Sequence, residues 1–280
     1  MAVRRRAGVV LLLFALTPAV ARAHHEAIFG PQSATVLTVD TYLSAQVFTR
    51  GTGPPADRTH ETTTALSGGF TPLGRLSVAL VMPFSVLRGG GVTRTGLEDA
   101  VVALRYRVDL PGATRGVSGS ETFVMAVGGV EVPTGTLDHE FGHDSIAPIA
   151  AGLASVEAGA MSAIGYGFVR NPARYEDTEE GANVFLGGGV AWTPVDRQDQ
   201  LLSLQVGLSR ESQRRSEAGG LALPHTGGWG VYVHPTVVYG ASQRLLFFGQ
   251  VSLPVHQEWR DPAEKETFRV GTGAMLRLGS

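Results

Sequence analysis

The feature that most constrains the fold is a two-residue alternation of apolar and polar side chains that recurs along most of the chain. It is clearest in six runs, at residues 35–48, 75–87, 97–109, 199–210, 243–254 and 266–278. In one of these runs, for example, Leu204 and Val206 flank Gln205. Because successive side chains of a β-strand point to opposite faces of the sheet, this period predicts strands with one apolar and one polar face.

Weaker alternation fills the gaps between the clear runs. Six further candidate strands lie at residues 59–70, 121–132, 146–156, 160–170, 181–194 and 229–240. The run 146–156 has the least contrast between its faces, because alanine and glycine supply most of its residues. Glycine accounts for 37 of the 280 residues, and glycine is unfavourable in helices. The sequence therefore predicts an all-β protein of about twelve strands.

The connections between these strands alternate in length. Long connections lie at 49–58, 88–96, 133–145, 171–180, 211–228 and 255–265, and short ones at 71–74, 157–159, 195–198 and 241–242. The connection 110–120, of medium length, is the exception. Long and short loops alternate in outer-membrane barrels, whereas soluble sandwiches usually have strands of about 5–6 residues. The pattern predicts a transmembrane antiparallel up-and-down β-barrel over residues 35–280.

The first 23 residues have the organisation of a secretory signal peptide. Arg4–Arg6 are followed by an apolar stretch at 7–20 and by the small-residue cleavage site Ala21-Arg22-Ala23. The apolar stretch is shorter than the about 20 residues that a membrane-spanning helix needs. We therefore expect an exported protein of a Gram-negative outer membrane. A periplasmic N-terminal segment at 24–34 would precede the barrel, and both termini would lie in the periplasm.

Charge and composition exclude several classes of function. Without the four arginines of the signal peptide, the chain has 19 basic and 25 acidic residues, a net charge of −6 with neutral histidine. Because no basic patch or stripe appears, nucleic-acid binding is not expected. The absence of cysteine excludes disulfides, thiolate zinc sites, iron–sulfur clusters and a cysteine nucleophile. The predicted partners are the lipid bilayer and a small solute. The sequence predicts no cofactor or enzymatic activity, and it leaves the oligomeric state open.

Several short motifs occur in order along the chain. They are Leu73-Gly74-Arg75-Leu76 with Met82-Pro83-Phe84, Gly96-Leu97-Glu98-Asp99 with Leu104-Arg105-Tyr106-Arg107, Val130-Glu131-Val132-Pro133-Thr134-Gly135, and Ser252-Leu253-Pro254-Val255. Through these motifs, most of residues 35–278 resemble the outer-membrane transporter family of phenol meta-pathway (phenol degradation) proteins. The resemblance implies a barrel channel for small, often hydrophobic, molecules. The chain departs from the family at Glu98, where glycine is expected, and at its C-terminus, which lacks a terminal aromatic residue.

Period-two counting predicts which polar side chains line the pore. The candidates are Asp40, Gln46, Arg105, Arg107, Glu131, Gln205, His234, Arg244, Gln250, Arg269 and Arg277. Guanidinium groups stay charged and are costly in lipid, so an inward direction is expected for the strand arginines. Together these arginines would form a basic stripe that favours anions or the carboxylate end of an amphipathic solute. The alternative is that they pair with acids and only brace the wall.

The predicted function is an outer-membrane channel or transporter for a small molecule, with hydrophobic and amphipathic molecules as the candidates. A structural barrel with a plugged lumen remains open as an alternative. Eight strands leave room for little more than side chains and sixteen enclose a water channel, and twelve lie between these cases.

Histidines suggest further alternatives. Residues 139–143 read HEFGH, which on a helix would place His139 and His143 on one face for zinc. Here they lie in a loop, and Gly142 disfavours a helix. A solvated acidic loop is the favoured interpretation. A metal site or an outer-membrane hydrolase that uses the loop 138–144 stays open, with Asp138, His139, His143 and Asp144 as the candidate residues. At the mature N-terminus, His24 and His25 could chelate Cu(II).

Overall fold

A computed structural model describes residues 41–55, 58–110, 122–136, 141–142, 145–171, 174–175, 178–197 and 200–278. The long strands are β1 (Tyr42–Thr52), β2 (Thr59–Phe70), β3 (Leu76–Gly89), β5 (Ala100–Asp109), β6 (Phe123–Val132), β7 (Ala147–Ala158), β8 (Met161–Arg170), β11 (Asn183–Arg197), β12 (Gln200–Gln213), β15 (Gly228–Gly240), β16 (Leu245–Gln257) and β17 (Glu266–Arg277). Each pairs antiparallel with its neighbours. The all-β prediction is confirmed.

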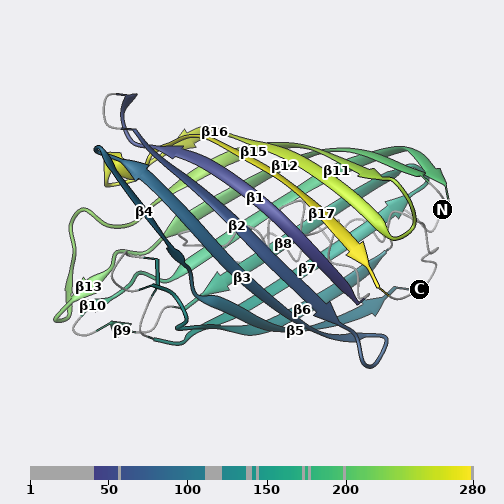
Figure 1. Cartoon of the computed structure of the whole chain (residues 1–280), viewed down its shortest axis with the longest axis horizontal. Coiled ribbons are helices and arrows are strands. Elements are labelled where there is room, and N and C mark those ends of the chain that lie inside the picture. The colour runs from purple at the N-terminus through teal and green to yellow at the C-terminus, as the bar shows by residue number, and fades with distance from the viewer. Residues whose placement is uncertain are drawn as a thin grey trace, which may run out of the picture.

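The sheet closes on itself. Strand β1 pairs with β17 on one side and with β2 on the other, and the pairing of β2 with β3 completes the ring. The short strand β4 (Val92–Leu97) and β5 both pair with β3, so they form one stave that is interrupted at residues 98–99. The result is a closed barrel of twelve antiparallel staves whose strands are tilted to the barrel axis (Figure 1).

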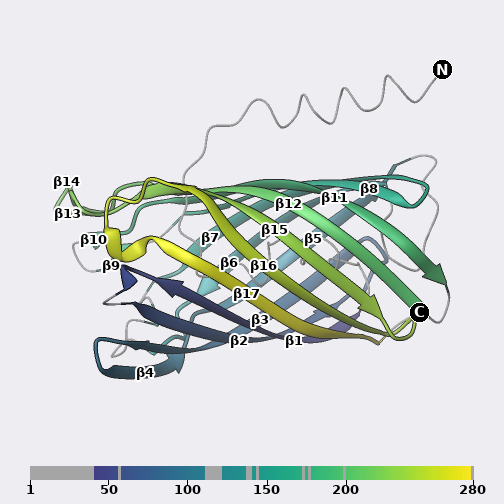
Figure 2. The same cartoon turned by 90° about the horizontal axis from the view of Figure 1, so that it is seen from above.

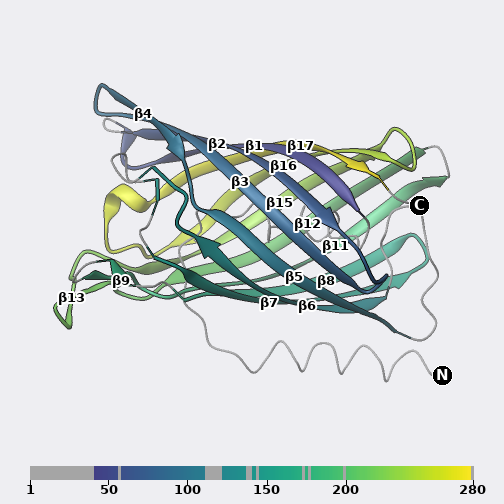
Figure 3. The same cartoon turned by 60° about the horizontal axis from the view of Figure 1, so that its bottom comes forward.

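The two ends of the barrel differ. At one end, the turn end, β1 begins, β17 ends, and the chain passes from β2 to β3, from β7 to β8 and from β15 to β16 (Figure 2). At the other, the loop end, the pairs β9 (Arg174–Tyr175) and β10 (Thr178–Glu179), and β13 (Glu217–Ala218) and β14 (Leu221–Ala222), form a second, four-stranded sheet. The short 3-10 helix η3 (Pro262–Glu264) also lies there. Figure 3 shows the same polarity from another side.

The two-residue turn between β7 and β8 shows how the sequence selects a connection. Only Gly159 and Ala160 separate β7 from β8, and Gly159 has a φ of 63°. Side chains other than glycine rarely adopt this left-handed conformation, and two-residue hairpin loops favour turns that need it. Gly159 therefore allows a loop of only two residues to connect the long strands β7 and β8.

Burial follows the predicted alternation. On β1, Tyr42, Ser44 and Gln46 are buried inside the barrel, whereas Leu43 and Val47 are exposed on its outer surface. The outer face carries exposed apolar side chains around the ring, among them Val78, Leu80, Val102, Leu104, Val206, Leu208, Phe247, Val251 and Leu276. Such a face is stable in lipid, and barrel closure gives each long strand a hydrogen-bonded neighbour on both sides. The predicted transmembrane barrel is confirmed. Among the described residues, no helix has the length and apolarity to cross a bilayer.

Every predicted strand has a counterpart, but several extend further at the loop end. Strand β1 continues to Thr52, β12 to Gln213 and β16 to Gln257, beyond the expected ends at residues 48, 210 and 254. These extensions are rich in polar residues, which resemble loop sequence, yet neighbouring strands continue to pair there. This difference matters for the site, because the extensions carry charged residues of the lumen.

Candidate functional site: the lumen of the barrel

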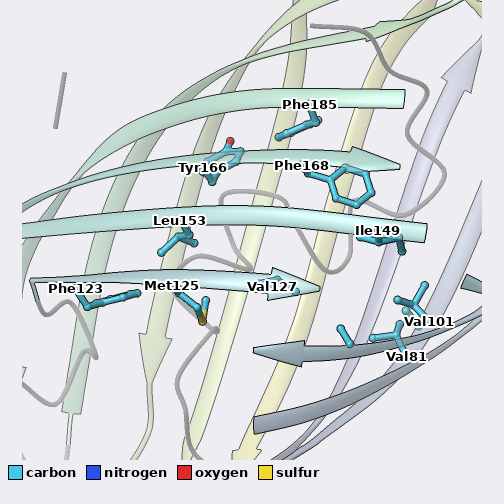
Figure 4. Close-up of a cluster of buried hydrophobic side chains, with 12 residues drawn as sticks. Val81, Val101, Phe123, Met125, Val127, Ile149, Leu153, Tyr166, Phe168 and Phe185 are labelled. Atoms are coloured by element: carbon cyan, nitrogen blue, oxygen red, sulfur yellow. The ribbon is translucent and has the colours of Figure 1, made fainter. Parts of the chain in front are cut away.

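One side of the lumen is an apolar wall. Buried apolar side chains from β2, β3, β5, β6, β7, β8 and β11 project into the barrel and form one cluster (Figure 4). Its members are Ala65, Val81, Val101, Ala103, Phe123, Met125, Val127, Ile149, Leu153, Tyr166, Phe168 and Phe185. Within it, the rings of Tyr166 and Phe185 stack with their centroids 5.5 Å apart. The two-residue alternation in the sequence does not predict this wall.

The opposite side of the lumen, on β12, β15 and β16, is polar at mid-height. His234 has no exposed surface; its Nε2 lies 2.6 Å from Ser209 Oγ and its Nδ1 lies 2.8 Å from Ser252 Oγ. Gln250 donates to Ser252 Oγ at 2.8 Å and accepts from Thr236 at 3.2 Å. A buried polar network of this kind holds each side chain in one orientation. The predicted lumen residues His234 and Gln250 therefore lie together.

At the turn end of the lumen, the polar surface of β12, β15 and β16 gives way to a second cluster of apolar side chains. It consists of Tyr42, Leu201, Val238, Leu246, Phe248 and Met275, all buried. The polar surface of β12, β15 and β16 is thus confined to the middle and the loop end of the lumen.

The loop end of the lumen holds a group of five charged side chains, the loop-end charge cluster, which consists of Arg50, Glu61, Glu211, Glu266 and Arg269. Arg269 donates to both carboxylate oxygens of Glu211, at 2.7 and 2.5 Å, and also binds Glu266. Arg50 binds Glu61 at 2.5 Å and Glu266 at 3.2 Å. The guanidinium of Arg269 also lies 4.4 Å from the ring centroid of Tyr232. These contacts join β1, β2, β12 and β17 across the point where the barrel closes.

A second group of charged side chains lies on β6 and β8, two of the strands that also carry the apolar wall. Glu131, on β6, binds Arg170, on β8, and Arg170 also binds Glu180 at 3.1 Å. The side chains of Arg170 and Glu131 are only 3% and 1% exposed. The predicted lumen residue Glu131 thus belongs to an ion pair, and its cation, Arg170, was not among the predicted lumen residues.

The turn end carries the arginines of β5. Arg105 donates to Ser77 Oγ at 2.9 Å and to Tyr42 Oη at 3.4 Å, and its Nη2 has no hydrogen-bond partner in the described part of the chain. Arg107 binds Asp109 at 2.6 Å and lies 4.1 Å from the ring centroid of Phe123. A Cβ at Gly69 would lie only 2.7 Å from Arg105 Nη2, so glycine there makes room for the guanidinium. Arg105 is therefore buried among neutral groups.

Two motifs of the family resemblance meet in the structure. Asp99, at the break between β4 and β5, accepts hydrogen bonds from the backbone N–H groups of Thr134 and Gly135, at 3.1 and 2.8 Å. Thr134 Oγ1 in turn accepts from the N–H of Ala100 at 2.8 Å. The segment after β6 therefore supplies hydrogen-bond partners for residues 99–100, where the stave formed by β4 and β5 is interrupted. Glu98, which departs from the family pattern, is buried beside it and accepts hydrogen bonds from Ser85 and Thr63.

Replacing Asp99 by alanine is expected to destabilise the barrel by about 1–3 kcal/mol, because the two backbone N–H groups lose their buried acceptor. Urea unfolding of the protein in liposomes measures this free energy. Asp196→Ala, at an exposed position near the turn end of β11, is the matched control and should change stability little. Equal stabilities of the Asp99 variant and the control would contradict the assigned role.

The remaining predicted lumen residues occupy different positions. Gln46 is buried and donates to Ser44 Oγ at 3.3 Å, and Gln205 is half-buried and donates to Ser203 Oγ at 3.4 Å. Arg277 is half-buried at the end of β17. Arg244 differs, because it is exposed in the turn before β16 and does not lie on the inner face of a strand.

The candidate metal and hydrolase residues His24, His25, Asp138, His139, His143 and Asp144 lie outside the described residues. Asp40, which was predicted to line the lumen, also lies outside them. Within the described ranges, no group of three or more His, Asp or Glu side chains is arranged to hold a metal ion.

Comparisons with known proteins identify the class of fold. The chain is similar to the COG4313 outer membrane channel from Pseudomonas putida F1, with a TM-score of 0.72 and 13% identity over 86% of this chain and 96% of that chain. It is also similar to the beta domain of the Bordetella autotransporter BrkA, with a TM-score of 0.54 and 10% identity over 85% of this chain and 100% of that one. The translocator domain of the autotransporter NalP from Neisseria meningitidis matches with a TM-score of 0.50 and 8% identity, over 98% of this chain and 96% of that domain.

These likenesses concern the fold, which is that of outer-membrane barrels. The three neighbours are a channel and two autotransporter domains, and none is an enzyme. No family model matches the chain, and no curated protein matches it.

Proposed function

We propose that the protein is an outer-membrane channel for a small apolar or amphipathic molecule. The observation that carries this proposal is the two-sided lumen, in which the apolar wall faces the polar network around His234. Ligand sites for such molecules combine an apolar surface with a few fixed polar groups. The apolar body of a solute would move along the wall, while its polar end exchanges hydrogen bonds on the other side. No chemical step is needed for this activity.

A resemblance of short sequence motifs and a likeness in structure support the proposal. The motifs of residues 73–135 and 252–255 resemble those of the phenol meta-pathway transporter family, whose members are expected to pass small, often hydrophobic, molecules. The neighbour from Pseudomonas putida F1 is described as an outer membrane channel. The proposed orientation follows from the signal peptide at residues 1–23, which would deliver the chain from the periplasm. The turn end would then be periplasmic and the loop end extracellular.

Conductance across a planar lipid bilayer tests the proposal. The refolded protein should give discrete ion currents that a small amphipathic acid, such as benzoate, reduces when added to one side. Protein that inserts and stays folded but neither conducts nor admits solutes into liposomes would refute channel activity.

A structural barrel with a closed lumen is the second candidate. It is favoured by the ion pairs inside the barrel, because Arg269 and Arg170 are each bound to two carboxylates that would hold the wall in one shape. The two candidates differ in the effect of lumen substitutions: in a closed barrel these change stability alone, and in a channel they also change conductance or selectivity.

Substitution of Arg105 and Arg107 by serine is expected to shift the reversal potential under a KCl gradient toward cation selectivity. Arg105 places positive charge among neutral groups at the turn end, and the acid that Arg107 binds, Asp109, is 32% exposed. Polar and charged linings of this kind control ion selectivity. Arg88→Ser, which removes a charge from the outer face of β3, serves as the control. An unchanged reversal potential with lowered thermal stability would mean that the arginines only brace the wall.

A further inference from the structure

The outer surface of the barrel is not uniformly convex. A groove of about 520 Å³ lies over β7, β8, β11, β12 and β15, which is within the about 300–1,000 Å³ typical of small-ligand sites. Its lining is predominantly apolar and includes Ala154, Ala163, Leu186 and Leu208. These residues have the parity of the lipid-facing side chains, so the groove opens to the membrane and not to the lumen.

The groove arises because small residues occupy adjacent positions on three strands. Ala154 pairs with Gly165, and Gly165 pairs with Gly188. On the next strand Leu208 pairs with Gly188 and forms one side of the depression. Three neighbouring positions therefore carry at most a methyl group, while large apolar side chains stand around them. A flexible hydrocarbon chain fits such a surface, because it can fill an irregular depression.

A positive charge borders the groove near the loop end. Arg210 lines the groove and is exposed on the same face as Val206 and Leu208. Its guanidinium lies 4.7 Å from the ring centroid of Trp229, whose Nε1 donates to Glu258 at 2.9 Å. Trp residues gather at the headgroup level of barrels. An arginine is costly in hydrocarbon, so Arg210 favours an anionic group at that level.

We infer that this groove binds one acyl chain of a phosphate-bearing membrane lipid, with the lipid phosphate at Arg210. The apolar lining matches the acyl chain, and the guanidinium of Arg210, which is itself part of the lining, matches the phosphate. The inference depends only on the transmembrane barrel, so the experiments on lipid binding test it independently of channel activity.

Native mass spectrometry of the detergent-solubilised protein tests the charge requirement. The probes are dipalmitoyl phosphatidylglycerol, which is anionic, and dipalmitoyl phosphatidylcholine, which has the same chains and no net charge. Arg210→Gln should weaken phosphatidylglycerol binding about five- to tenfold, which corresponds to roughly 1–1.4 kcal/mol of binding free energy and to the net contribution of about one hydrogen bond. The control Arg88→Gln, also exposed on an outward-facing position, should bind it as the parent does.

Filling the groove tests the acyl-chain requirement. Ala163→Leu, alone and together with Ala154→Leu, should weaken binding of both lipids at least fivefold, whereas Ala45→Leu, on the outer face of β1, should not. Heat-modifiable migration on gels verifies folding, and the single variant suffices if the double variant does not fold. Parental lipid binding by Arg210→Gln and Ala163→Leu would overturn the inference. A shift from oligomer to monomer in Ala163→Leu, with lipid binding intact, would also overturn it, because the groove would then be a contact between copies of the chain.

Discussion

Replacing Arg269 by methionine is expected to destabilise the barrel by about 3–5 kcal/mol, because the substitution leaves the buried Glu211 carboxylate without the cation that binds it, whereas Glu266 keeps its contact with Arg50. Arg269 supplies both guanidinium hydrogen bonds that Glu211 accepts and also binds Glu266. Methionine keeps much of the side-chain volume, so the loss reports on charge more than on packing. Urea unfolding in liposomes, followed by tryptophan fluorescence, measures the change.

The second half of a double-mutant cycle separates the pair from its surroundings. Glu211→Gln added to Arg269→Met removes the carboxylate charge that Arg269→Met strands, so the double variant should be more stable than the sum of the single changes predicts. Arg88→Met, on the outer face of β3, controls for loss of a guanidinium without a buried partner. A loss below about 1 kcal/mol for Arg269→Met, the level of an exposed ion pair, would show that water screens the loop-end charge cluster.

The loop-end charge cluster illustrates what the sequence could not predict. The inward direction of Arg269 follows from alternation, but its partner Glu211 lies 58 residues away, on a strand brought near by barrel closure. Arg50 and Glu211 also lie beyond the predicted ends of their strands, at residues 48 and 210, in polar extensions that resemble loops. Glu266 has the parity of an outward residue, yet the register shifts between Gly51 and Thr52 and Glu266 is buried inside. A local bulge of this kind is not readable from period-two counting.

The apolar wall was missed for a different reason. On β6, Phe123 and Met125 face the lumen while Val124 and Ala126 face outward. Both faces of the strand are therefore apolar, and alternation disappears from the sequence. The same holds on β7, where Ile149 and Leu153 face inward and small residues face lipid. In the sequence, a strand that is apolar on both faces forms a continuous apolar run. The sequence therefore predicts the strands β6 and β7 but not which of their side chains face the lumen. In contrast, β12 alternates clearly, and the lumen position of Gln205 and the lipid-facing position of its neighbours could be predicted.

Arginine at Val206 is expected to destabilise the barrel by about 2–4 kcal/mol, the cost measured for a guanidinium near the bilayer midplane. Val206 lies at the middle of β12, between Val190 and Pro235 on the adjacent strands, and its side chain is 55% exposed on the outer face. Gln205→Arg, one residue away, places the same charge in the lumen beside Ser203 and should cost far less. Leu204→Arg should again be costly, because the side chain returns to the lipid face.

Urea unfolding of the three variants in liposomes compares their free energies of unfolding directly. Equal losses at all three positions would be incompatible with an outer face in lipid and an inner face in a polar lumen, because only that alternation makes adjacent residues of one strand respond differently to the same charge.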